Sequence, residues 1–188
     1  GLLSSFKGRT VISEEDYDNF HTELSSVKAT TGRILALAKD VAEKKAEIVK
    51  CSQQIDMLVP WETLDIPLDL NGTEKTSIFI GALPGDWTLD AIYNAMAEHL
   101  PVDVTIISHD KNQTCIMLIC GKDSYEGVNA ALRGIGFAYP SVACSATPVQ
   151  QKETLAKQIE KLEEEIKTCE EEIISYDDQR KKIKFFSD

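Results

Sequence analysis

Histidine and cysteine are common catalytic and metal-binding side chains, and this chain has three histidines and five cysteines. The histidines, His21, His99 and His109, stand far apart and form no metal-ligand spacing. The cysteines are odd in number and include no C-x-x-C pair, which is typical of reduced thiols that pack as small apolar side chains. We therefore expect no catalytic residue, no metal site and no enzyme activity, and we expect a reducing compartment.

Two other patterns resemble ligand sites. Residues 81–85, Gly-Ala-Leu-Pro-Gly, stand between an expected strand and an expected helix, where a phosphate-binding loop could lie. The segment lacks the G-x-x-x-x-G-K-[ST] spacing and has no lysine for a phosphate, which indicates a tight turn. The acidic triplets at 163–165 and 170–172 splay around a helix and indicate a solvated face. We expect no cofactor and no small-molecule substrate.

The charge distribution argues against nucleic-acid binding. The net charge is -11, and acidic residues outnumber basic ones at both ends and in the middle of the chain. A surface that neutralises phosphates needs clustered Lys and Arg, which no segment here provides. The sequence also has no apolar run of about 18 residues, so we expect no membrane span. Residues 1–7 are too short an apolar stretch for a signal peptide.

A 4-3 spacing of apolar residues occupies both ends of the chain. Such spacing keeps one narrow stripe facing a second helix and is typical of a coiled coil. The first stripe comprises Phe20, Leu24, Val27, Thr31, Ile34, Ala38, Val41, Lys45, Ile48, Ser52, Ile55 and Val59. The second comprises Leu155, Ile159, Leu162, Ile166, Cys169, Ile173, Tyr176, Arg180 and Ile183. We expect an antiparallel two-helix coiled coil from residues 13–59 and 148–186, locally weakened where the stripe is polar.

Helix-end signals support these boundaries. Ser13 stands three residues before Asp16, as in a capping box, and Pro60 ends the first helical pattern. Thr147, Pro148 and Gln150 form a second capping box with proline at the first helical position. Residues 30–32, Thr-Thr-Gly, are poor helix formers, and we expect a bend or local fraying there.

The middle of the chain, residues 60–147, predicts a globular α/β lobe. We expect strands at 76–81, 102–108 and 114–120, helices at 88–100 and 123–132, and a proline-interrupted edge strand at 139–146. The order β-α-β-β-α-β is typical of the ferredoxin-like fold, a four-stranded antiparallel sheet with two helices on one face. The fold class is therefore α+β, a coiled coil with an inserted lobe.

The expected strand at 114–120 is apolar at both odd and even positions. A sheet with helices on only one face normally alternates apolar and polar residues, so its second face must also be covered. Two covers are possible: a partner, or the chain's own connecting segment with Trp61, Leu64 and Ile66. A base-stacking role is not expected, since this strand contains no aromatic residue.

The residues that join the first helix to the lobe resemble a known family. They read Leu-Val-Pro-Trp-Glu-Thr-Leu-Asp-Ile at 58–66, Gly-Thr-Glu-Lys-Thr at 72–76 and Ile-Phe-Ile-Gly-Ala-Leu-Pro at 78–84. Together they resemble subunit I of the A/V-type ATP synthases, the counterpart of subunit a of the vacuolar proton ATPases. The resemblance is sharpest over residues 55–85.

The resemblance implies a cytoplasmic stator arm of a rotary, ion-translocating complex. The chain would comprise the coiled coil and distal lobe, and would join peripheral stalk subunits of the E/G type to the membrane domain of the same polypeptide. We expect the lobe to bind the stalk through an open sheet face and the nearby loop, using Phe79, Leu83, Pro84, Trp87, Ile116 and Leu118. The alternatives are a small-molecule-binding regulatory module carried on a coiled coil and an arm of a nucleic-acid enzyme, and the acidic charge argues against the latter.

Overall fold

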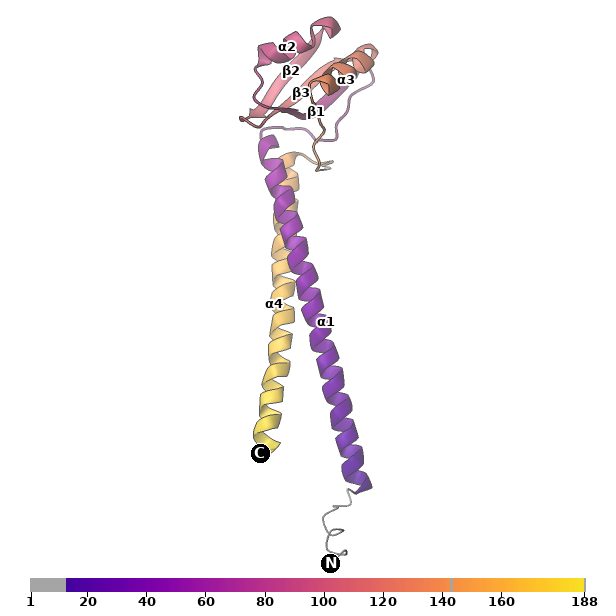
Figure 1. The fold of residues 1–188 in the computed structure, drawn as a ribbon, viewed down its shortest axis with the longest axis vertical. Coiled ribbons are helices and arrows are strands. Elements are labelled where there is room, and N and C mark those ends of the chain that lie inside the picture. Colours follow the sequence, from indigo (N-terminus) through magenta and orange to yellow (C-terminus); the bar gives the residue numbers. More distant parts are fainter. Residues whose placement is uncertain (1–12, 143, 188) are drawn as a thin grey trace, which may run out of the picture. The chain divides into compact units, whose positions relative to one another are not determined.

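The structure, a computed structural model, describes residues 13–142 and 144–187, with side chains to residue 181. It has the α+β composition expected from the sequence (Figure 1). Its helices and strands are α1 (Glu14–Leu58), β1 (Thr76–Pro84), α2 (Leu89–Ala95), β2 (Val102–His109), β3 (Gln113–Gly121), α3 (Tyr125–Gly134) and α4 (Pro148–Ser187), with short 3-10 turns at Val59–Trp61, Ala97–His99 and Lys122–Ser124.

The chain divides into two compact units, each of which takes part of both long helices. The arm unit comprises residues 13–46 and 162–187, and the lobe unit comprises residues 47–161. The lobe unit therefore contains the last turns of α1 and the first turns of α4 as well as the sheet. None of the described helices is long and apolar enough to span a membrane.

The predicted caps of both long helices are confirmed. The Oγ of Ser13 accepts a hydrogen bond from the backbone N–H of Asp16 at 3.1 Å. At α4, the Oγ1 of Thr147 accepts from the N–H of Gln150 at 3.3 Å, and the Oε1 of Gln150 accepts from the N–H of Thr147 at 3.1 Å. This reciprocal pair is a capping box, and Pro148 occupies the first helical position behind it.

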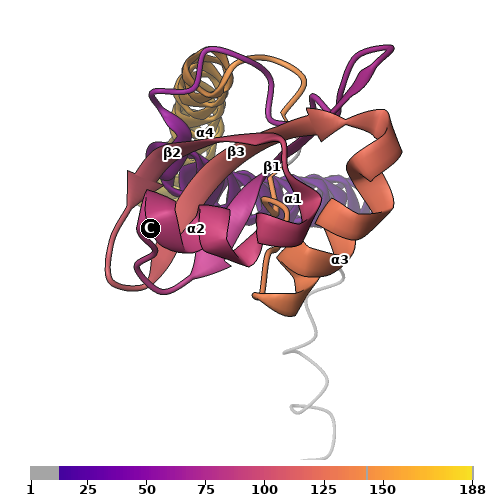
Figure 2. The same ribbon diagram turned by 90° about the horizontal axis from the view of Figure 1, so that it is seen from above.

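The lobe unit contains a three-stranded antiparallel sheet in the order β1-β3-β2. Helices α2 and α3 cover one face of this sheet (Figure 2). The core beneath them, here called the helix-side core, is fully closed. It comprises Phe79, Leu83, Ile92, Met96, Val104, Ile116, Leu118, Cys120, Val128 and Leu132, none more than 5% exposed.

The prediction of a fourth strand at 139–146 is wrong for the described residues. Only an isolated bridge forms beside β1, in which Ala82 and Ala138 exchange N–H to O hydrogen bonds of 2.9 and 3.0 Å. Pro140 has no N–H and cannot extend a ladder, so pairing stops after one bridge. Ala143, which belonged to the expected strand, lies outside the described residues.

Gly81 is required where this bridge approaches β1. A Cβ built at Gly81 would stand 2.4 Å from the carbonyl oxygen of Ala138 and 2.4 Å from the ring of Phe137. Both distances are far shorter than van der Waals contact. The segment after α3 can therefore lie against β1 only because position 81 has no side chain.

The second face of the sheet is covered by the chain itself, which decides between the two covers considered from the sequence. The linker residues Trp61, Leu64 and Leu68 pack there with Ile80 and Cys115, and Ile66 packs partly buried against them. The remaining buried members of this linker-side core are Cys51, Leu58, Val142, Cys144 and Leu155. The odd- and even-numbered residues of β3 are both apolar because both faces of the sheet are buried.

In the arm unit, α1 and α4 lie side by side and antiparallel (Figure 1). The predicted stripe of α4 is confirmed at Ile166, Cys169, Ile173 and Tyr176, which are buried or half-buried. At Arg180 it is wrong, since that residue is exposed. The side chain of Ile183 lies outside the described ones.

The first predicted stripe is correct at only four of its twelve residues, Ile34, Val41, Ile48 and Ile55, which are buried or half-buried. Ile34 and Val41 lie in the seam as expected, but Thr31, Ala38 and Lys45 are exposed. The residues that precede them, Thr30, Leu37 and Lys44, take their places. The same shift occurs in the lobe unit, where Cys51 and Leu58 are buried while Ser52 and Val59 are exposed. The seam thus selects the larger apolar residue of the pairs 37/38 and 58/59.

Candidate docking surface

The structure buries four of the six residues that the sequence placed on a partner-binding surface. Phe79, Leu83, Ile116 and Leu118 are each 0% exposed in the helix-side core. They point toward α2 and α3, so the expectation that they form an open sheet face is corrected. The physical reason is the two-residue period of a strand, in which a shift of one residue exchanges the two faces.

Pro84 and Trp87, the other two, lie in the loop of residues 84–88 at the end of β1. Pro84 is exposed and Trp87 is half-buried. The indole Nε1 of Trp87 donates to the carbonyl of Pro84 at 2.8 Å, and its backbone N–H donates to the Oγ1 of Thr114 at 2.8 Å. Thr114 in turn donates to the carbonyl of Gly85 at 2.8 Å. These bonds fix the loop to β3, which leaves a rigid, partly apolar surface.

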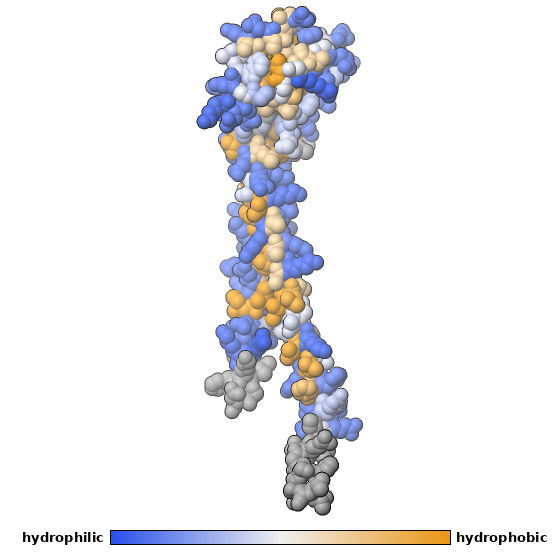
Figure 3. All heavy atoms as spheres, viewed as in Figure 1, coloured by the Kyte–Doolittle hydropathy of each residue, from blue (hydrophilic) through white to orange (hydrophobic). Residues whose placement is uncertain are grey.

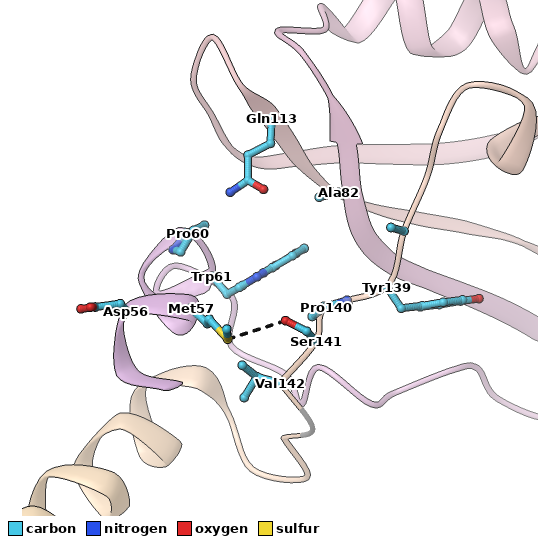
Figure 4. Close-up of a pocket in the computed structure, with 11 residues that line it drawn as sticks. Asp56, Met57, Pro60, Trp61, Ala82, Gln113, Tyr139, Pro140, Ser141 and Val142 are labelled. Carbon is cyan, nitrogen blue, oxygen red and sulfur yellow. Dashed lines mark hydrogen bonds between the residues drawn. The ribbon is translucent and has the colours of Figure 1, made fainter. Parts of the chain in front are cut away.

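A concave surface borders β1 at Ala82, and the sequence did not predict it. This groove, of about 460 Å³, is here called the Trp61 groove (Figure 4). Its lining residues are Asp56, Met57, Pro60, Trp61, Ala82, Gln113, Ala138, Tyr139, Pro140, Ser141 and Val142. The aromatic and proline pairs at 60–61 and 139–140 are the only sequence signal for it, and their separation along the chain conceals that they meet.

The free thiols are poor nucleophiles. Cys51, Cys115, Cys120 and Cys144 are buried, and burial raises the pKa of each thiol. Cys115 belongs to the linker-side core and Cys120 to the helix-side core, so the two point to opposite faces as expected. Within residues 13–142 and 144–187, no group of three or more His, Cys, Asp or Glu side chains is placed to hold a metal ion.

Ion pairs line the seam of the arm unit. Arg33 makes a bidentate pair with Glu172, with N to O distances of 2.8 and 3.1 Å. Lys44 bonds Asp40 at 2.9 Å and approaches Glu165 at 3.6 Å. The hydrogen bond from Arg33 lowers the pKa of Glu172, and the one from Lys44 lowers the pKa of Asp40. Exposed pairs of this kind add little stability, but a bidentate pair fixes which residues of two helices face each other.

No family model matches the chain, and no curated protein matches it. Comparison with solved structures gives a match in fold. The chain is similar in fold to a V-ATPase subunit homologue. That structure is the cytoplasmic N-terminal domain of subunit I, a homologue of subunit a of V-ATPase. The match has a TM-score of 0.52 and 16% identity, and it covers 76% of this chain.

The match covers 48% of the subunit I structure, so this chain spans about half the length of that domain. At 16% identity the likeness concerns the fold. The structure matched in fold is a subunit I, the protein that the motifs at residues 55–85 resemble. The resemblance rests on short sequence motifs and the match on backbone geometry.

Proposed function

We propose that this chain is part of the stator arm of a rotary A/V-type ATPase or ATP synthase. In that role it performs no catalysis. It connects the ion-translocating membrane domain of its own polypeptide to the peripheral stalk at the cytoplasmic face. The observation that carries the proposal is the likeness in fold to the cytoplasmic N-terminal domain of subunit I.

The construction of the helices suits a part that carries load. α1 has 45 residues and α4 has 40, which at 1.5 Å per residue gives lengths of about 67 and 60 Å. α1 is helical without a break through the expected weak point at 30–32, so the helix does not fray there. Ion pairs between α1 and α4 oppose sliding of one helix along the other, since each pair fixes a register.

The lobe is the proposed binding end, and its loop of residues 84–88 is the proposed contact with an E/G-type stalk subunit pair. We retain Pro84 and Trp87 as contact residues because they are accessible. The other four predicted residues are buried in the helix-side core and cannot contact a partner. A preformed loop favours binding because little conformational entropy is lost when a partner docks.

Calorimetric titration of the chain with a purified stalk subunit pair tests the proposal. We expect saturable binding to the unchanged chain and at least tenfold weaker binding to Trp87→Ala. Tyr17→Ala is the matched control, because Tyr17 is 61% exposed and lies in the arm unit. Absence of binding by the unchanged chain would contradict the stator role. Equal binding by Trp87→Ala, folded by near-ultraviolet circular dichroism, would contradict the loop contact alone.

A further inference from the structure

We propose that two copies of this chain pair through the first turns of α1, with the two helices antiparallel. The contact surface, here called the free stripe, comprises Tyr17, Phe20, Leu24 and Val27. All four residues belong to the arm unit, so the site involves neither the lobe nor the 84–88 loop and does not depend on the stator role. The inference rests on the exposure of the free stripe, its offset from the seam with α4, and the charge pattern along α1.

The free stripe lies on a length of helix with a fully exposed surface. Every residue from 13 to 29 is exposed, and the seam with α4 begins at the half-buried Thr30. Tyr17, Phe20 and Val27 are 61, 64 and 59% exposed, and Leu24 is 40% exposed. Apolar side chains are visible on the surface of the arm (Figure 3). A stripe of apolar residues at steps of three and four is the surface that a second helix covers.

The free stripe is not an extension of the seam between α1 and α4. That seam takes residues 30, 34, 37, 41 and 44, and the same steps lead back through positions 27, 23, 20 and 16. Positions 23 and 16 are Glu23 and Asp16, whose carboxylates would be costly to bury against α4. The apolar residues of these turns are Leu24 and Tyr17, one position further along. The free stripe is therefore turned partly away from α4 and suits a different helix.

The free stripe is complementary to itself when the two copies are antiparallel. The pairs 17/27 and 20/24 share one midpoint, so a two-fold axis near residue 22 places Tyr17 opposite Val27 of the second copy and Phe20 opposite its Leu24. Each layer then joins one large aromatic ring to one smaller aliphatic side chain, which fills the space between the helices evenly. A parallel pair would place two Tyr17 rings in one layer and two Val27 side chains in another.

The charge along α1 selects the same orientation. Residues 14–23 have no Lys or Arg and contain the acidic residues Glu14, Glu15, Asp16, Asp18 and Glu23. Residues 24–39 have no Asp or Glu and contain the basic residues Lys28, Arg33 and Lys39. An antiparallel pair sets the acidic turns of each copy beside the basic turns of the other, with Glu14 near Lys28 of the second copy. A parallel pair would set acid against acid, which is unfavourable.

Two other occupants of the free stripe fit less well. Closure of the same hairpin would require α4 to continue its seam along α1, and Asp16 and Glu23 oppose that packing. A membrane surface would require Lys and Arg beside the apolar stripe, since anionic headgroups attract basic amphipathic helices. The free stripe is flanked instead by the carboxylates of residues 14–23.

The first test is the concentration dependence of the oligomeric state of the intact chain. Only four residues of each copy form the contact, so we expect a weak dimer with a dissociation constant of roughly 10–100 µM. Sedimentation equilibrium at chain concentrations from about 5 to about 500 µM covers this range. Phe20→Ser should leave the chain monomeric throughout, because the dimer loses two rings at its centre. The matched control is Leu35→Ser, at a residue 65% exposed on the same helix but outside the free stripe, and it should change the constant less than twofold.

The second test is the orientation of the pair, measured by charge reversal. Glu14→Lys or Lys28→Glu alone should weaken the dimer at least threefold, since each places like charges together twice. Both substitutions in one chain should restore it to within twofold, because the opposite charges face each other again only in an antiparallel pair.

Three results would each overturn the proposal: an unchanged chain that stays monomeric at every concentration, equal pairing by a Phe20→Ser variant with unchanged helical circular dichroism, or no restoration by the double reversal. Binding of a stalk subunit pair through the 84–88 loop is measured separately. That binding should be the same for Phe20→Ser, because the loop belongs to the lobe unit.

Discussion

The two compact units of this chain are held together in different ways. In the lobe unit, a sheet is buried on both faces, and Phe79, Leu118 and Leu132 are completely shielded. In the arm unit, a single seam joins two helices, and even its best-buried residues, Leu37 and Ile166, keep 5 and 8% of their surface exposed. Ion pairs supplement this seam. The lobe unit is therefore expected to be the more stable of the two. The stability of the arm unit is expected to depend on pH and salt.

The difference extends to the surface of each unit. In the first turns of α1, Phe20 is 64% exposed and Val27 is 59% exposed, although both belong to the 4-3 stripe. Apolar side chains accordingly gather on the surface of the arm helices (Figure 3). The lobe unit buries nearly every large apolar side chain of its strands. Two packed helices shield only one line of side chains from water. Apolar side chains outside that line therefore stay exposed.

Leu118→Ala is expected to have the largest effect, because it opens a cavity at the centre of β3 beneath both helices. The free energy of unfolding should fall by about 2–5 kcal/mol. Both tryptophans lie in the lobe unit, so urea unfolding followed by their fluorescence measures this unit. Leu89→Ala, at a residue 41% exposed, is the control and should change little. A loss below 1 kcal/mol at Leu118 would contradict the closed core.

Leu37→Ala tests the seam of the arm unit and its corrected register. We expect a loss of about 2–3 kcal/mol for that unit, at the low end for leucine because the seam is narrow and adjusts easily. Helical circular dichroism at 222 nm should fall at lower urea while tryptophan fluorescence is unmoved. Leu35→Ala, 65% exposed on the same helix, is the matched control. Equal effects of the two substitutions would refute the assigned seam.

Much of this organisation could be predicted from the sequence, and the failures have identifiable physical causes. The N-terminal ends of α1 and α4 were predictable because Ser13, Thr147, Pro148 and Gln150 perform local capping chemistry. The strands were predictable because they are short apolar runs between turn residues. From Thr31 onward the first stripe was wrong at every second position, because adjacent residues such as Leu37 and Ala38 both satisfy a 4-3 pattern.

The prediction of the docking surface was wrong for a related reason. β3 is apolar at every position from Cys115 to Cys120, so the sequence alone cannot say which parity faces the helices. The prediction of a fourth strand was wrong because Pro140 stops the pairing with β1 after one bridge. The Trp61 groove could not be predicted, because Trp61 and Tyr139 are distant in sequence and only the folded linker brings them to one cavity.

Gly81→Ala is expected to weaken the lobe unit at one local contact. An added Cβ would overlap the carbonyl of Ala138 and the ring of Phe137, so the bridge beside β1 must open or shift. We expect a loss of about 1–3 kcal/mol by tryptophan fluorescence. Gly121→Ala is the control, because nothing lies within 4 Å of its added Cβ. If the two substitutions behave alike, the bridge does not depend on glycine.

Acidification is expected to destabilise the arm unit, with a smaller effect than the substitutions above. The pKa values of Glu172 and Asp40 are lowered in the folded chain by Arg33 and Lys44. A lowered pKa means that the ionised form favours folding, so this stability is present above the ordinary carboxylate pKa near 4 and is lost as pH falls through the folded value. The helical signal should weaken between pH 5 and 3.

The control for this acid effect is the double substitution Glu172→Gln with Asp40→Asn. It removes both titrating groups and should make the melting temperature of the arm unit less dependent on pH over that range. High salt should reduce the effect in the unchanged chain, since the pairs are exposed. An identical pH dependence before and after substitution would show that these ion pairs do not couple to folding.

Gly32→Ala is expected to have the smallest effect, and in the opposite direction. α1 is helical through Gly32, and no atom lies within 4 Å of an added Cβ, so alanine meets no obstacle. Glycine costs about 1 kcal/mol relative to alanine inside a helix, and removal of that cost should raise the urea midpoint of the helical signal. The tryptophan transition should stay fixed, because the substitution lies outside the lobe unit. A parallel rise of both transitions would mean that the two units unfold as one.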